Sequence, residues 1–251
     1  FVLFKVGKKG SLNNSRRKRT NMKPYGRKTK KQVGEILSLD SRCQALDRLA
    51  QIPDAQLTGH LFSYFYNKDE LIKFRSVTAM GELAARIAAN SMEKARIILR
   101  RIMWNLNDES GGIGWGSPEA MGEILSKSQN LAREFKNILF SYLDHKGNHI
   151  EHEILQRGVL WGIGTYLGSA PRDLTDVTRE QLRDHLSSKD SVKRGYAIRA
   201  LSNAHVFESM DLPDFIRADE TIIDIYTGWN FTATRISDMV RTCPQKDRGL
   251  K

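Results

Sequence analysis

Two stretches of the chain gather the residue types that could do chemistry. Residues 107–117, NDESGGIGWGS, hold four glycines and Trp115 directly after the carboxylates of Asp108 and Glu109. Residues 144–153, DHKGNHIEHE, hold three histidines and three acidic residues. Histidine beside carboxylate is the usual material of a divalent-metal site and of general acid–base catalysis.

A glycine-rich loop can also hold a phosphate, but this one lacks the pattern. No lysine follows GGIGWG, and the segment before it has helical rather than strand periodicity. Asp108 and Glu109 would repel an anion. The stretch suits the start of a helix better, with Ser117 as N-cap, Pro118 as the first helical residue and Glu119 in the first turn, where the helix dipole favours a carboxylate.

An internal repeat would position both stretches. Small residues recur in a shared helical pattern at spacings of 41, 40 and 40, at Gly81, Gly122, Gly162 and Ser202. An amphipathic segment and a polar loop precede each of these helices, and a pair at about 30–52 would add a fifth unit. Such units bury their apolar faces only by stacking, and a period of about 40 residues is that of HEAT and armadillo repeats.

The four aligned small residues need an explanation, because glycine inside a helix costs about 1 kcal/mol relative to alanine. We expect a structural packing role for Gly81, Gly122, Gly162 and Ser202, in which neighbouring helices approach closely. We prefer this to a chemical role.

The second-helix pattern and the period resemble HEAT-like repeat proteins, including the phycobilisome-lyase type. The stretch RIMWNLNDESGGIGWGSPEAMGEIL, followed by EHEILQRGVLWGIG, resembles an uncharacterised group of HEAT-like proteins from sulfate-reducing bacteria. The resemblance covers about residues 30–241. It implies an all-α fold, an α-α superhelix of four to five helical hairpins, with no catalytic residues and no cofactor.

The C-terminal part departs from the repeat. Residues 220–240 alternate in hydrophobicity around Thr227-Gly228-Trp229-Asn230, which predicts a β-hairpin, and a short helix is expected at about 236–242. We expect this segment to cap the last apolar face of the stack, although Trp229 at the turn could instead anchor a ligand. The predicted divisions are therefore a tail at 1–31, a solenoid at 32–212 and a C-terminal segment at 213–251.

The charge is concentrated in the tail. Residues 1–31 hold twelve of the 40 Lys and Arg and no acidic residue, so with a total of +11 the rest of the chain is close to neutral. We expect a disordered basic tail, which could bind nucleic acid without reading its sequence. Arg16-Arg17 can be encoded as AGG-AGG, which resembles a ribosome-binding sequence ahead of Met22. We hypothesise that residues 1–21 are not native, which N-terminal sequencing would test.

Two further features bound the function. Cys43 and Cys243 are the only cysteines, too few for a disulfide framework, and no apolar run approaches the roughly 20 residues of a membrane helix. We therefore expect a cytoplasmic protein that does not enter a membrane.

The repeat predicts where the two polar stretches meet. Equivalent loops of a solenoid lie side by side, so 107–117 should lie beside 144–153, and we call this pair of loops the loop edge. Long loops on rigid scaffolds often carry recognition. The candidate binding residues are Asp108, Glu109, Trp115, Glu119, His149, Glu151 and His152. Two alternatives stay open: a solvated polar edge, and a metal or acid–base enzyme site using His149 and His152.

We expect a non-catalytic protein-binding adaptor or scaffold, with a protein partner in the solenoid groove or at the loop edge. The alternative is nucleic-acid binding, as in the HEAT-like alkylpurine glycosylases. That function requires a basic concave face, for which the chain offers Lys94, Arg96, Arg100, Arg101, Lys193, Arg194 and Arg199.

Overall fold

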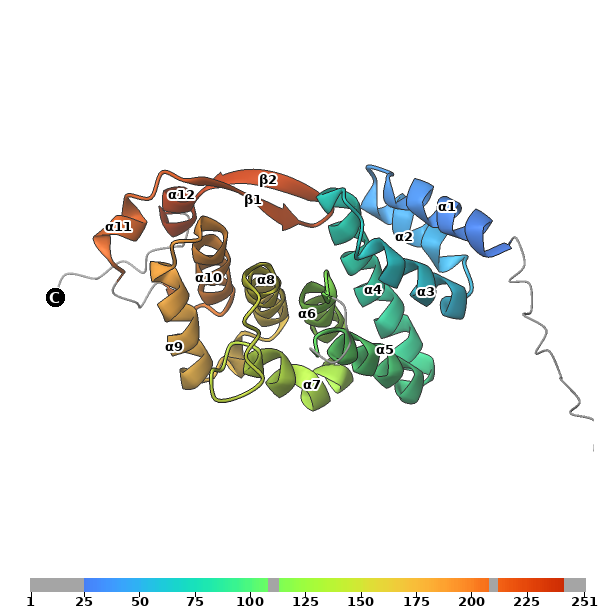
Figure 1. The fold of residues 1–251 in the computed structure, drawn as a ribbon, viewed down its shortest axis with the longest axis horizontal. Coiled ribbons are helices and arrows are strands. Elements are labelled where there is room, and N and C mark those ends of the chain that lie inside the picture. Colours follow the sequence, from blue (N-terminus) through green and yellow to red (C-terminus); the bar gives the residue numbers. More distant parts are fainter. Residues whose placement is uncertain (1–24, 108–112, 208–211, 242–251) are drawn as a thin grey trace, which may run out of the picture.

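A computed structural model of the protein describes residues 25–107, 113–207 and 212–241. These residues form an all-α fold with one β-hairpin, which confirms the predicted fold class (Figure 1). The elements are α1 (Tyr25–Leu37), α2 (Arg42–Ala50), α3 (Asp54–Tyr64), α4 (Glu70–Asn90), α5 (Met92–Asn105), α6 (Ser117–Lys127), α7 (Gln129–Ser141), α8 (Glu153–Ser169), η2 (Pro171–Asp173), α9 (Asp176–Asp184), η3 (His185–Ser187), α10 (Ser191–Asn203), α11 (Asp214–Arg217), β1 (Ile222–Thr227), β2 (Asn230–Arg235) and α12 (Ile236–Arg241).

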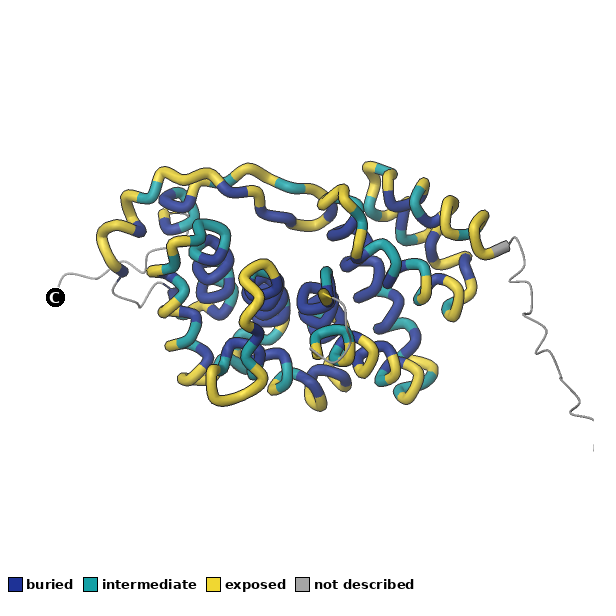
Figure 2. The backbone as a smooth tube through the Cα atoms, viewed as in Figure 1, coloured by how far each residue is buried: buried dark blue, intermediate teal, exposed yellow. Residues whose placement is uncertain are grey.

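The helices stack as successive pairs. The second helices α4, α6, α8 and α10 pack against one another in that order and form the buried inner layer (Figure 2). The first helices of the pairs, α3, α5, α7 and α9, lie on their outer side, and α1 with α2 precedes them (Figure 1). This order places the loops that lead into the inner helices along one edge.

Helix starts are set by short polar caps. Asp69 accepts hydrogen bonds from the backbone of Leu71 and Ile72 at the start of α4, and Asp190 does the same at the start of α10. The start of α6 differs from the prediction, because Gly116 with φ 69° is its N-cap and Ser117 is its first residue. A Cβ at Gly116 would lie 3.0 Å from Phe65, so neither the conformation nor the space suits a larger residue.

The inner helices approach closely at glycine. A Cβ added to Gly122 of α6 would lie 2.3 Å from the Cα and the carbonyl oxygen of Gly162 in α8. Gly81 of α4 similarly faces the backbone of Glu123 in α6, 3.2 Å from where its Cβ would be. The contact leaves no room for a side chain at Gly122, and at Gly81 a side chain would fit only if Glu123 moved by a few tenths of an ångström.

The third joint of the inner layer uses a different position. A Cβ on Gly164 of α8 would lie 3.3 Å from Cα of Ala200 in α10. Ser202, which the repeat aligns with the packing glycines, is half-exposed near the end of α10. The repeat register therefore shifts by about one helical turn before the last inner helix.

The β-hairpin does more than cap the last unit. Its antiparallel strands pair Ile222 with Arg235 through Thr227 with Asn230, and Gly228 at the turn has φ 71°. It runs from α10 across the inner layer to α4 and the α1–α2 connection (Figure 1). The predicted end cap is thus a strap over the whole stack.

Aromatic packing and one arginine hold this strap. Tyr226 of β1 contacts Phe74 of α4 at 5.0 Å and Trp161 of α8 at 6.2 Å between ring centroids. At the turn, Trp229 donates from Nε1 to the carbonyl of Leu39 at 2.7 Å. The buried Arg75 donates to the carbonyls of Leu37 and Trp229 and to the Asn230 side chain. The hairpin turn is therefore tied to the start of the chain.

The N-terminal boundary also differs from the prediction. Helix α1 begins at Tyr25, so residues 25–31 belong to the first helix and not to the basic tail. Residues 1–24 lie outside the described residues. Over the described ranges, none of the helices combines the length and the apolar character that a membrane span requires.

The glycine contact between α6 and α8 predicts a selective loss of stability. Gly122→Ala should lower the free energy of unfolding by about 1–3 kcal/mol, because its Cβ would overlap the backbone of Gly162. Gly59→Ala in α3 is the matched control, since no described residue lies within 4 Å of its added Cβ, and it should raise the free energy of unfolding by about 1 kcal/mol. Urea unfolding of both variants checks this, and equal effects would contradict the role of the contact.

Candidate functional site

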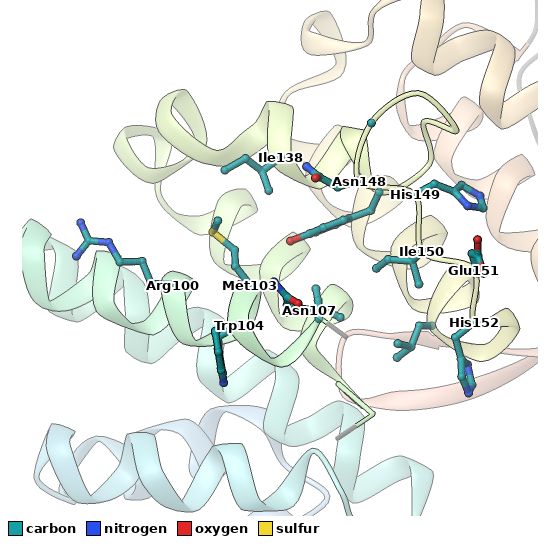
Figure 3. Close-up of a pocket in the computed structure, with 14 residues that line it drawn as sticks. Arg100, Met103, Trp104, Asn107, Ile138, Asn148, His149, Ile150, Glu151 and His152 are labelled. Carbon is teal, nitrogen blue, oxygen red and sulfur yellow. The ribbon is translucent and has the colours of Figure 1, made fainter. Parts of the chain in front are cut away.

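A cleft of about 800 Å³ opens at the loop edge, between α5, α7 and residues 147–152 (Figure 3). The α5 side carries Arg100, Met103 and Trp104, and the opposite side is formed by the loop that leads into α8 (Figure 3). Asn107 and His149 both line it. The cleft is thus lined by residues of both stretches, 107–117 and 144–153, that the sequence predicts to be neighbours.

The cleft has apolar walls and a polar rim. Its apolar lining residues are Met103, Trp104, Leu106, Ile138, Tyr142, Ile150 and Leu155. Trp104 is 56% exposed, which is unusual for so large an apolar side chain. Burial raises the pKa of Tyr142 to about 12, so its hydroxyl stays neutral at physiological pH. A surface of this kind suits apolar contact with a few orienting hydrogen bonds.

The loop that walls the cleft is held by short-range hydrogen bonds. Asp144 accepts from the backbone of Lys146 through its side chain and from Gly147 through its carbonyl. The backbone N–H of Ile150 donates to the carbonyl of Tyr142 at 3.2 Å. The loop is therefore anchored at its start by a turn and at its end by the buried Ile150.

The two predicted loops touch through Trp115. Its ring meets that of His152 edge-on, with the centroids 5.3 Å apart. Trp115 is partly buried and packs against the core, and it does not line the cleft. Asp108 and Glu109 lie outside the described residues.

Sequence reasoning missed Trp104. The buried residues of α5 are Ala95, Ile98, Leu99 and Ile102, and Trp104 does not share their stripe. Ile97, seven residues earlier, lies on the same side of the helix as Trp104 and is 55% exposed. A tryptophan and an isoleucine seven residues apart on the otherwise polar face of the helix were the sequence signal that could have indicated this exposed apolar surface.

Glu119 does not belong to the exposed edge, which corrects the sequence prediction. It is only 6% exposed, and its carboxylate lies against Gly158 of α8, where an added Cβ would be 2.6 Å from Cδ. Among the residues that the structure describes, none is a hydrogen-bond partner of its Oε2. Burial raises the pKa of Glu119 above its ordinary value, against the opposing effect of Lys73. The first turn of α6 faces inward because its helix packs on both neighbours.

The metal alternative finds no support in the geometry. His149 is in the loop and stacks on His145 with ring centroids 3.9 Å apart, whereas His152 is the N-cap of α8 and faces Trp115. The two rings therefore do not share a helical turn. Across the described ranges, no three His, Cys, Asp or Glu side chains are placed to hold a metal ion.

The basic residues proposed for nucleic acid do not form an open basic face. Lys193 is 4% exposed, Arg194 pairs with Asp219, and Arg199 donates to the Trp161 carbonyl beneath the hairpin. In α5, Lys94 is exposed and Arg101 lies over the ring of Phe62 at 4.0 Å, whereas ion pairs join Arg96 to Glu134 and Arg100 to Glu93. Most of these charges are neutralised or buried within the stack.

Comparisons with known proteins give no activity. No family model matches the chain. The chain is similar to an uncharacterised protein of Archaeoglobus fulgidus, with 29% identity over 184 residues that cover 72% of this chain and 91% of that protein. It also has a weak likeness to the crystal structure of an engineered protein, with a TM-score of 0.40, 16% identity and coverage of 70% and 79% of the two chains.

The buried carboxyl of Glu119 predicts a pH-dependent stability difference. Its pKa is raised on folding, so its contribution is fully present below about 4.5 and is lost as the pH rises through the folded-state value. Glu119→Gln replaces the carboxyl by an amide of similar shape that is neutral at every pH. The variant should therefore gain stability relative to the native chain as the pH rises from 4.5 to 7.5, measured by urea unfolding at both values.

The matched control is Glu134→Gln. The hydrogen bond from Arg96 lowers the pKa of the exposed Glu134, so the sign is opposite and the contribution of this carboxylate is lost as the pH falls. If Glu119→Gln instead lost stability relative to the native chain between pH 4.5 and pH 7.5, the raised pKa of Glu119 would be wrong.

Proposed function

We propose that this chain is a non-catalytic binding protein of the HEAT-like helical-repeat class, and that its loop-edge cleft captures an apolar segment of a protein partner. The observation that carries the proposal is the exposed Trp104 beside an apolar cleft of about 800 Å³. Exposed tryptophans next to well-formed pockets are typical anchors of protein interfaces.

Neighbouring side chains extend this surface. Ile97, on the same face of α5 as Trp104, is 55% exposed, so this helix face carries two large exposed apolar residues. Ile113, in the loop before α6, is a further exposed apolar residue at 42%. Arg100 on the same helix adds a residue type that is enriched at interfaces. Exposed apolar groups gathered in this way support a protein partner better than a small ion.

The loop edge is the better candidate of the two surfaces predicted from the sequence. The inner face of the stack, which the groove hypothesis would use, is covered by Tyr226 and the rest of the hairpin. This coverage supports the loop edge over the groove as the binding surface.

Trp104→Ala tests the proposal. The full-length tagged chain is cross-linked in cells of the native organism, and partners recovered on it are compared with those recovered on the variant. The partner captured by the native chain should fall by more than tenfold, since a hot-spot residue contributes about 2 kcal/mol or more. Thermal stability should change little, because the side chain is mostly exposed.

Two controls make this result specific. Phe215→Ala removes another large exposed side chain, 52% exposed on α11, and should leave capture intact. A chain without residues 1–24 separates any binding by the basic tail. Equal capture by the native chain and Trp104→Ala would rule out the cleft, and salt-sensitive recovery of nucleic acid would favour the alternative function.

A further inference from the structure

A chain of hydrogen bonds with a fixed direction ends at His149 in the cleft wall. The buried Lys193 of α10 donates from Nζ to Oε1 of Gln156 and to Glu153. An ammonium group can only donate, so it fixes the Gln156 amide with its oxygen toward Lys193. Nε2 of Gln156 therefore faces the loop, where it donates to the carbonyl of Ile150 at 2.7 Å and lies 3.3 Å from Nε2 of His149.

This direction dictates the protonation state of His149. Because Nε2 of Gln156 can only donate, Nε2 of His149 must accept, and only a neutral imidazole can do so. A protonated ring would bring one N–H against another. It would also place a positive charge beside His145, whose ring centroid is 3.9 Å away.

The surroundings of His149 disfavour its charged form. Burial, His145 and Lys193 lower the pKa of His149, while Glu151 and Asp144 raise it, and the net direction is down. Burial and Lys193 also lower the pKa of the nearby His185. The charged and titratable groups around His149 are Asp144, His145 and Glu151 of its own loop, Glu153 of α8, Asp184 at the end of α9, His185 of η3 and Lys193 of α10.

We propose that His149 is a pH-sensitive latch on the cleft: when neutral it accepts from Gln156 and holds residues 144–152 as the cleft wall, and when protonated it releases them. The consequence for partner binding rests on the proposed function, because a released loop removes His149, Ile150 and Glu151 from the lining. Opening is local, since the tip residues 145–148 are exposed and Ile150 alone is buried in the core.

The sign of the effect follows from linkage. The pKa of His149 in the closed loop lies below its ordinary value of 6.5, to which it returns in the open loop. The closed loop therefore has its full stability above about 6.5 and loses stability as the pH falls below that value. Neutral pH should keep the cleft formed, and mild acid should open it.

Amide hydrogen exchange of Ile150, measured by NMR on the full chain, tests the latch without any partner. Its N–H donates to Tyr142 only when the loop is closed. After correction for intrinsic exchange, protection should fall between pH 7.5 and 5.5, by up to about tenfold for each unit over which the ring protonates. The N–H of Ile236, which donates to the carbonyl of Thr221 at the base of the hairpin, should keep its protection and is the control for a general effect of acid.

Three variants separate the latch from a general effect of acid. His149→Gln retains an acceptor near the same position but cannot be protonated, so Ile150 should stay protected at both pH values. His149→Ala has no acceptor and should be unprotected at both. His145→Gln, the matched control in the same loop, should keep the response and move its midpoint upward, because the electrostatic effect of His145 that lowers the pKa of His149 is removed.

The outcomes for the latch and for the proposed function are distinguishable. If protection of Ile150 is the same at both pH values, or if His149→Gln responds to pH as the native chain does, the latch is wrong even when capture through Trp104 stands. If the exchange results are as expected but Trp104→Ala does not affect capture, the latch is correct and the binding function fails. Capture by the native chain that depends on Trp104 and falls between pH 7.5 and 5.5, together with the expected exchange results, supports both.

Discussion

The contact between Gly122 and Gly162 is the constraint on which the rest of the structure depends. Two helix backbones meet there with no side chain between them, which fixes the distance and register of α6 and α8. One turn earlier in the same joint, the carboxylate of Glu119 occupies the space left by Gly158. The starts of the two helices are consequently side by side, and the loops that lead into them meet at Trp115 and His152.

The hairpin decides which surface of this stack stays open. It returns from the last unit to the first, where Arg75 places its guanidinium between the carbonyls of Leu37 and Trp229. A buried arginine is tolerated only when its donors are satisfied, and here the chain segments that it joins supply the acceptors. Because the hairpin covers the inner helices, the proposed binding function falls to the loop edge.

Much of the fold was predictable because it rests on local patterns. The polar loops and the turn at Gly228 are each visible within a few residues of the sequence. The 40-residue period comes from the repetition of one such short pattern along the chain. The reach of the hairpin was not predictable, because the bond from Trp229 to Leu39 joins residues 190 positions apart and leaves no local pattern. The inward position of Glu119 was missed for a similar reason, since a first-turn acid is ordinarily solvated.

The sequence predicted that the two loops are neighbours, but it did not predict the contacts of the polar residues at the starts of the inner helices. Lys193 reads as a basic surface residue in isolation, yet its acceptors, Glu153 and Gln156, come from the preceding unit. Stacking creates this cluster, so no single unit contains it. The buried ammonium of Lys193 needs an acceptor, which fixes the Gln156 amide with its oxygen toward Lys193. The Gln156 nitrogen then faces His149, which must accept from it. The packing of two repeats thereby sets the protonation state of a side chain in the cleft wall.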